Sequence, residues 1–358
     1  MQIRSLELKN FRCFPSYRQS FGGPLTLIQG DNGSGKTSIL EALYYACYVR
    51  SFRTHKSGEV AKSGQESFFI KVVVEDGAGQ EHTLSVGFEQ GKKEVKVNGK
   101  AVTSYKELVS LYRVVAITED DLLLIKGEPE IRRTFIDQVL LTGNPSYGAT
   151  VSTYRAYLKQ RNALINSPQF LDRHLLTLWT EKLWSLSETI RQERRQTIAK
   201  LESQANKLIT SYFPELGTLT CTYQIPEENQ GVGGVEQWLV QSGEHERHAQ
   251  RTLFGPHLDD IRFELGSLAC KQYTSRGQQK LVAVILKLAH LGLVCDKGAI
   301  VLLDDFMTDF DPERARVLLE LLKSYQTHLF FTTPQAREQA RYLFTDEFEI
   351  LTLREGVR

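Results

Sequence analysis

The sequence is poor in cysteine and in long apolar runs, and it has no marked excess of charge of either sign. Its five cysteines are widely spaced and form no C-x-x-C pair, which argues against a disulfide framework or a zinc ribbon. The amino terminus carries charges where a signal peptide needs an apolar run. The apolar run from Leu281 to Cys295 is interrupted by Lys287 and His290. We therefore expect a cytoplasmic protein without a membrane span.

A formal net charge of +1 neither supports nor excludes a polyanionic partner, because a nucleic-acid-binding protein can gather its basic residues on one face. No segment is biased enough in composition to indicate disorder. The length of 358 residues allows two or three domains. These features predict a folded globular protein.

The strongest motif is a glycine-rich loop that matches the phosphate-loop pattern G-x-x-x-x-G-K-S/T. The loop and the residue after it are Gly30, Asp31, Asn32, Gly33, Ser34, Gly35, Lys36, Thr37 and Ser38. The preceding apolar run and the helical spacing that follows predict the strand, loop and helix that this motif requires. The glycines allow backbone N–H groups to surround phosphate, Lys36 places a catalytic charge on the β and γ oxygens, and Thr37 binds Mg²⁺. The motif predicts a site for ATP and Mg²⁺.

A second motif lies near the other end of the chain, where the apolar run 300–303 is followed by Asp304 and Asp305. It resembles a Walker B element, in which a buried strand ends in acids. Asp304 is expected to hold Mg²⁺ through water, and Asp305 to orient or deprotonate the attacking water. Without the phosphate loop, two acids that end a strand at the surface would be the simpler interpretation.

Ahead of the Walker B run, residues 274–280 resemble the ABC signature and are followed by a helical pattern. Ser275, Gly277 and Gln278 would lie at the amino end of this helix, where free N–H groups can meet a γ-phosphate. A signature helix cannot reach its own phosphate loop in such an architecture, so the motif implies a second subunit. Taken alone, Ser275 could be only a helix cap.

Three further segments have positions along the chain that correspond to known loops of ABC-like ATPases. Thr308, Asp309, Phe310 and Asp311 occupy the place of the D-loop, which contacts the other subunit in ABC-like dimers. The run 329–331 ends where a switch histidine is common, and the candidates there are Thr332 and Thr333. The segment 117–120 stands where a Q-loop is expected, without a clear glutamine. The lack of a switch histidine predicts weak ATP hydrolysis.

Alternating apolar and polar residues at 68–74, 83–89 and 93–97 predict an antiparallel sheet beside the nucleotide site. Residues 147–212 show helical spacing instead. We therefore predict an α/β fold, a split ABC-type P-loop ATPase head with a flanking antiparallel β-sheet and an inserted helical lobe. The head is expected to comprise residues 1–140 and 250–358, with the lobe at 141–249.

Together these motifs resemble the RecF family of bacterial recombination mediators, which is related to SMC-type ATPase heads. The resemblance covers nearly the whole chain and includes the segments 8–12, 30–37, 50–54, 124–137, 158–164, 255–260 and 275–280. It places Arg12 among the nucleotide-binding residues. It implies an ATP-dependent homodimer that binds duplex or gapped DNA, works with a RecR-type mediator protein, and helps to load recombinase during DNA repair and the SOS response. It also implies a slow, DNA-stimulated ATPase.

Basic residues give only modest independent support for DNA binding. Residues 153–200 hold nine Lys or Arg against four Asp or Glu, among them Arg191, Arg194 and Arg195, and residues 91–100 hold four Lys against one Glu. These charges could belong to ordinary solvated faces. His245, His248 and His257 lack the spacing of a metal site and are interpreted as surface residues. Since Asp305 stands where glutamate is usual, a nucleotide-gated binding module with negligible hydrolysis is the alternative function.

Overall fold

The chain folds into two compact units in the computed structural model. Unit 1 comprises Met1–Asp121 and Lys287–Arg358, and unit 2 comprises Leu122–Leu286. The structure describes residues 1–54, 56–102, 108, 111–167, 172–229, 233–294, 298–305, 310–325, 327–334 and 347–353.

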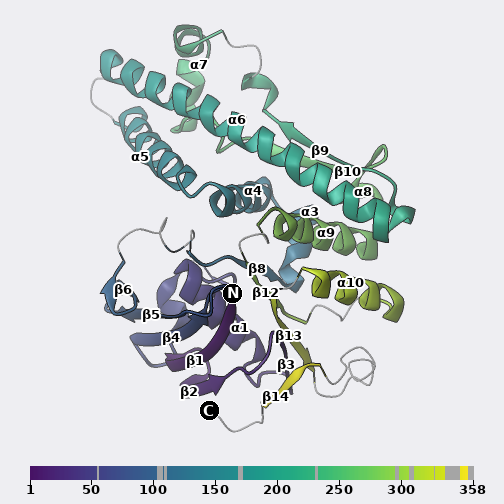
Figure 1. Ribbon diagram of the computed structural model, residues 1–358. Helices are drawn as coiled ribbons and strands as arrows, with labels where there is room; N and C mark the ends of the chain where they lie inside the picture. Colours follow the sequence, from purple (N-terminus) through teal and green to yellow (C-terminus); the bar gives the residue numbers. More distant parts are fainter. Residues whose placement is uncertain are drawn as a thin grey trace. The chain divides into compact units, whose positions relative to one another are not determined.

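Unit 1 contains two sheets (Figure 1). The antiparallel sheet has the order β2-β1-β4-β5-β6-β7, with the strands β1 Gln2–Phe11, β2 Phe14–Ser20, β4 Ser67–Glu75, β5 Glu81–Glu89, β6 Lys92–Val97 and β7 Lys100–Ala101. The parallel sheet has the order β14-β3-β13-β12-β8, with the strands β3 Leu25–Gly30, β8 Val114–Ile117, β12 Ile300–Leu303, β13 His328–Pro334 and β14 Glu349–Leu353. The predicted antiparallel strands are therefore confirmed, and the buried strand expected before Asp304 is β12, which pairs in parallel with β13.

The described helical elements of unit 1 include α1 Lys36–Tyr48, α10 Pro312–Ser324, the end of α9 Arg276–Val294, and the short turns η1 Ser57–Val60 and η2 Glu119–Leu122, the last of which crosses into unit 2. Helix α1 is buried on almost every side because it contacts strands of both sheets. Its apolar side chains join those of β1, β4 and β12 in one core cluster. This core fixes the helix that follows the phosphate loop.

Unit 2 is mainly helical. Its elements are α3 Leu123–Lys126, α4 Pro129–Gly143, α5 Tyr147–Ile165, α6 Arg173–Tyr212, η3 Pro214–Leu216, β9 Leu219–Gln224, η4 Glu227–Asn229, α7 Val235–Ala249, β10 Asp260–Leu265, β11 Leu268–Ala269 and α8 Cys270–Tyr273. Helices α5 and α6 come from the segment 147–212 that was predicted to be helical, and they lie side by side (Figure 1), with Tyr157 against Trp179. Helix α9, Arg276–Val294, begins in unit 2 and ends in unit 1.

The division of the chain differs from the predicted boundaries after residues 140 and 249. The crossings fall at 121/122 and 286/287, so α4, β10 and the segment around Ser275 belong to unit 2. The physical reason is packing, since α4 contacts both α6 and β10 within that unit. No described helix is both long and apolar enough to cross a membrane.

Two buried histidines, His290 and His328, should make the stability of unit 1 depend on pH. Burial lowers the pKa of His290 and of His328 to about 3, against 6.5 in an unfolded chain. The unfolded state therefore binds more protons below pH 6.5, so stability present above that pH is lost progressively toward pH 3. We expect the free energy of unfolding to fall between pH 6.5 and 5 in chemical denaturation experiments.

The variant His328→Asn provides the control for this pH dependence. Asparagine Oδ1 is attached to Cγ, as histidine Nδ1 is, so it can still accept the hydrogen bond that Ile3 N donates to His328 Nδ1 at 2.9 Å, but it does not titrate. One fewer proton should be taken up on unfolding of the variant. The slope of its free energy of unfolding against pH should therefore be smaller by roughly 1.4 kcal/mol per pH unit. An unchanged slope would contradict the assignment.

Candidate functional site

The phosphate loop joins β3 to α1, as predicted, and its glycines are required for different reasons. Gly33 and Gly35 have φ of 84° and 101°, the left-handed region that other residues rarely adopt. A Cβ on Gly35 would lie 2.5 Å from Phe14 Cζ, and a Cβ on Gly30 would lie 2.7 Å from the Leu353 carbonyl oxygen. The loop is therefore packed tightly on one side, while Asp31 and its two following neighbours are exposed.

The amino end of α1 has no side-chain cap, so its first N–H groups remain available to an anion. Lys36 folds back over the loop, where its Nζ donates to the carbonyl oxygens of Gly30 at 2.8 Å and Asp31 at 3.0 Å. Ser34 is half-buried beside Gly30, and Ser38 lies in the first turn, 3.9 Å from Cys13 Sγ. The predicted residues 30–38 thus form one continuous cradle.

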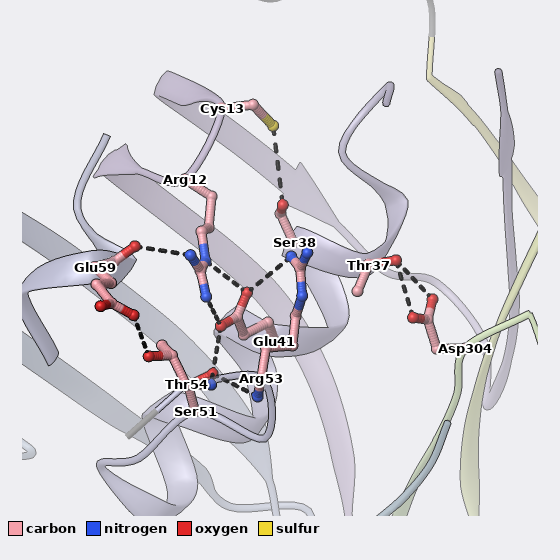
Figure 2. Close-up of polar contacts among 10 residues, drawn as sticks. All are labelled: Arg12, Cys13, Thr37, Ser38, Glu41, Ser51, Arg53, Thr54, Glu59 and Asp304. Carbon is pink, nitrogen blue, oxygen red and sulfur yellow. Dashed lines mark hydrogen bonds and ion pairs between the residues drawn. The ribbon is translucent and has the colours of Figure 1, made fainter. Parts of the chain in front are cut away.

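Thr37 meets Asp304 at the carboxyl edge of the parallel sheet (Figure 2). The Thr37 hydroxyl donates to both carboxylate oxygens of Asp304 at 2.9 Å. The backbone N–H of Asp304 donates to the Ile117 carbonyl oxygen at 2.9 Å, which fixes the end of β12 to β8. A hydroxyl and a carboxylate that converge beside a phosphate loop are oxygen ligands of the kind that Mg²⁺ takes. These two residues therefore fit the predicted metal site.

Asp305 follows Asp304 in the left-handed region, with φ of 45°. Its backbone N–H donates to Thr332 Oγ1 at 2.9 Å, and Thr332 Oγ1 donates to Asp304 Oδ1 at 2.8 Å. Thr333 Oγ1 instead makes a 3.4 Å contact with the carbonyl oxygen of Pro334 in its own strand. Of the two candidate threonines, only Thr332 is therefore bonded to the Walker B acids among the described residues.

Arg12 lies in the turn between β1 and β2, where its φ is 52°. Its guanidinium forms a fork on the buried carboxylate of Glu41, with Nε to Oε2 at 2.8 Å and Nη2 to Oε1 at 2.5 Å (Figure 2). Its Nη1 donates to the Glu59 carbonyl oxygen at 2.7 Å. The guanidinium predicted to bind nucleotide is thus engaged with helix α1 and with η1.

Glu41 also holds the segment that follows α1. Its carboxylate accepts from Ser51 Oγ at 2.5 Å and from Arg53 Nη1 at 3.5 Å, and Thr54 bonds Glu59 nearby (Figure 2). Sequence reasoning did not single out Glu41. A lone acid within the apolar pattern of a buried helix was the available signal, because a buried charge requires partners.

Ser275 caps helix α9 in unit 2. Its Oγ accepts from the Gln278 backbone N–H at 3.2 Å, and Gln278 Oε1 accepts from the Ser275 N–H at 3.0 Å, which makes a capping box. A Cβ on Gly277 would meet nothing within 4 Å. The hydroxyl proton of Ser275 is not used by the cap, so the residue can cap the helix and still donate to a ligand.

Several other predicted residues have different surroundings. Asp311 caps α10 by accepting from the Arg314 N–H at 3.0 Å, while Thr308 and Asp309 lie outside the described residues. His245 and His248 are exposed, as predicted, but His257 is half-buried and its Nδ1 lies 2.6 Å from the Tyr154 hydroxyl. Burial lowers the pKa of His257 to about 4.

The structure corrects the interpretation of the α6 arginines. Arg191 and Arg194 are buried and form forks on Asp259 and Asp137, so they are not surface contacts for DNA. Arg195 is exposed. In the β6 region, Lys93 Nζ donates to the Val49 carbonyl oxygen at 2.9 Å, and the half-buried Lys96 forms an ion pair with Glu94. Lys92 and Lys100 of the same hairpin are exposed.

Comparison with known proteins agrees with this fold. The family model of the RecF/RecN/SMC N terminal domain matches residues 2–345. The chain is 30% identical to the DNA replication and repair protein RecF of Thermosynechococcus vestitus, over 96% of this chain and 95% of the relative. It is 31% identical to the protein of the same name from Natranaerobius thermophilus, over 90% and 88% of the two chains.

Solved structures show the same similarity. One is described as the recombination mediator protein RecF with ATP in the RecFOR pathway, and it superposes with a TM-score of 0.85 at 25% identity, over 94% of this chain and 92% of the other. An SMC head domain from Pyrococcus furiosus shares the fold, with a TM-score of 0.56 at 14% identity, over 99% and 94% of the two chains. The fold is therefore that of the SMC-type ABC ATPase heads, and the chain belongs to the RecF family.

Proposed function

We propose that the chain is an ATP-dependent DNA-binding protein of DNA replication and repair, which binds ATP and Mg²⁺ at residues 30–38. The observation that carries this proposal is the meeting of Thr37 and Asp304 at 2.9 Å beside an uncapped helix amino end. Lys36 supplies the charge for the β and γ phosphates, and Asp305 is the proposed base for the attacking water. Bound Mg²⁺ would neutralise phosphate charge. The name of the similar solved structure, RecF with ATP, supports the choice of nucleotide.

We infer an ATP-driven homodimer from the signature segment in unit 2. Glycine is a poor helix former compared with alanine, so a glycine in a helix calls for a reason. Nothing among the described residues requires Gly277 to lack a side chain, since a Cβ there would meet open space. Close approach of an outside group, such as the γ-phosphate bound by a second copy, accounts for this glycine and for the unused proton of Ser275.

DNA and a RecR-type mediator are the proposed macromolecular partners. The similar curated proteins are named for DNA replication and repair, and the similar structure for recombination mediation. Exposed lysines of the β6 hairpin and Arg195 could contact DNA phosphates without reading sequence. In this proposal the closed dimer holds duplex or gapped DNA in the cytoplasm and helps to load recombinase, and slow, DNA-stimulated hydrolysis times release.

One observation, the aspartate at position 305, favours a second function, that of a nucleotide-gated binding module. Asp305 is one methylene shorter than the glutamate that is usual there, which would place the carboxylate farther from an attacking water. In this alternative, ATP only licenses dimer formation and hydrolysis is negligible. Single-turnover hydrolysis with and without DNA separates the two functions, since only the first predicts a DNA-stimulated rate.

The variant Ser275→Arg tests the composite site. It should leave ATP binding by one subunit intact but prevent the ATP-bound dimer, because a long cation would occupy the space of the approaching phosphate. Light scattering with Mg²⁺ and ATP should report dimers for the parent and monomers for the variant. Ser16→Arg, the same substitution at an exposed position of β2, is the control and should dimerise normally. Normal dimerisation of Ser275→Arg would contradict the composite site.

A further inference from the structure

Thr332 occupies a special position in the parallel sheet. It stands near the carboxyl end of β13, which pairs with β12 so that Leu303 lies opposite Phe331. Asp304 follows Leu303 at the end of β12, and Thr332 follows Phe331 on β13. The two side chains therefore meet at the edge of the sheet. Thr332 is only 5% exposed. Its hydroxyl thus acts inside the protein.

The hydroxyl of Thr332 contacts both Walker B acids. It has one proton, which it donates to Asp304 Oδ1 at 2.8 Å, and it accepts the N–H of Asp305 at 2.9 Å. Since its single proton is already used, this hydroxyl cannot donate to a γ-phosphate in the same arrangement. A switch residue must make such a contact, so the geometry points to another role.

Each of the two bonds fixes a different property of the acids. The bond to Oδ1 limits rotation of the Asp304 carboxylate, which also faces Thr37. The bond from the Asp305 N–H satisfies a backbone group in the left-handed region, at φ of 45°. For a residue other than glycine this conformation is unfavourable, so it persists only where the surroundings hold it.

We propose that Thr332 is a positioning residue that orients both Walker B acids, rather than a sensor of the γ-phosphate. It sets the rotamer of Asp304 toward the metal and the backbone of Asp305 toward the water. The proposal rests on the proposed function, because it assumes that Asp304 serves bound Mg²⁺. ADP with Mn²⁺ is the decisive probe, since this complex contains the metal but has no γ-phosphate.

The central experiment compares three variants by electron paramagnetic resonance of Mn²⁺ in the ADP complex. Thr332→Val keeps the shape but removes the hydroxyl, and the Mn²⁺ affinity should fall by about 10-fold to 100-fold, as for other residues that orient a metal ligand. Thr332→Ser keeps the hydroxyl and should stay near the parent. Thr333→Val removes the neighbouring hydroxyl, which only contacts its own strand, and should also stay near the parent.

A second readout needs neither metal nor nucleotide. In the free protein, the Asp305 amide should exchange with deuterium faster in Thr332→Val than in the parent or in Thr332→Ser, because its acceptor is gone. If the valine variant does not fold, Thr332→Cys retains a weak donor and should show a smaller change in the same direction. These shifts are expected even if ATP hydrolysis is too slow to measure.

The possible outcomes separate failure of the proposed role of Thr332 from failure of the proposed nucleotide site. Equal Mn²⁺ affinity for the parent and Thr332→Val in ADP would overturn the positioning role. Weaker ATP binding in that variant with unchanged Mn²⁺ and ADP binding would overturn it in favour of a γ-phosphate contact. Parent protein that binds neither Mn²⁺ nor ADP would overturn the proposed nucleotide site itself, and this inference with it.

Discussion

Glu41→Gln should lower the free energy of unfolding by about 3 kcal/mol, the lower end of the range for breaking a buried ion pair. The carboxylate is fully buried and is shared by Arg12 and Arg53, whose side chains are 19% and 44% exposed. Glutamine has nearly the same volume but cannot balance two guanidinium groups. Because water reaches both arginines in part, it screens some of the lost attraction. Urea denaturation followed by circular dichroism measures the change.

The same substitution at an exposed ion pair is the control for Glu41. Glu320 accepts from Arg316 at 3.0 Å on the surface of α10, and both side chains are 62% exposed. Glu320→Gln should therefore cost at most about 0.5 kcal/mol. Limited proteolysis should also cut residues 50–54 faster in Glu41→Gln, since an NH₂ group that cannot accept replaces one of the two oxygens shared by Arg12, Ser51 and Arg53. Equal stability of the two variants would show that Glu41 does not anchor this segment.

The positions of Lys36, Thr37 and Asp304 could be predicted because they follow from short sequence patterns. The spacing in the phosphate loop places Lys36 and Thr37 at the start of a helix, and an apolar strand that ends in acids places Asp304 at the carboxyl edge of a parallel sheet. The parallel strands of one sheet end at the same edge, and only β13 separates β3 from β12. Thr37 and Asp304 therefore meet at 2.9 Å although they are far apart in the chain.

The partners of the charged residues could not be predicted in this way. The fork of Arg12 on Glu41 depends on a left-handed turn between two strands and on a segment that returns after α1. The sequence around Arg191 and Arg194 fits a solvated basic face equally well. Only the packing of α6 against Asp137 and Asp259 decides that these arginines are buried.

The unit boundaries escaped prediction for a related reason. Residues 147–212 have a helical pattern that is visible in the sequence, but the pattern says nothing of which neighbouring elements pack on those helices. Arg132 forms a fork on Asp260, which ties α4 to β10 across more than a hundred residues of chain. Such contacts assign α4 and β10 to unit 2. Membership in a unit is thus set by long-range pairing rather than by periodicity.

Asp305→Asn should slow ATP hydrolysis by about 10²-fold to 10⁴-fold, the usual contribution of a general base, while ATP and Mg²⁺ still bind. Asparagine fills the same volume, and it tolerates the left-handed φ of 45° that the position requires. The backbone bond to Thr332 should therefore survive, so the loss belongs to the carboxylate. Single-turnover hydrolysis and equilibrium titration of ATP separate the two effects. An unchanged hydrolysis rate would remove Asp305 from the mechanism.

The same variant tests whether hydrolysis times the release of DNA. If the closed ATP dimer is the state that holds DNA, a variant that cannot hydrolyse ATP should keep its dimers, and duplex DNA should dissociate from it more slowly than from the parent in ATP. In ADP neither protein is expected to form the closed dimer, so their DNA dissociation rates should agree, which provides the internal control. Equal dissociation rates in ATP, measured where the loss of hydrolysis is confirmed, would mean that turnover does not set the lifetime of the DNA complex. In that case ATP binding alone would govern the clamp, as the nucleotide-gated alternative requires.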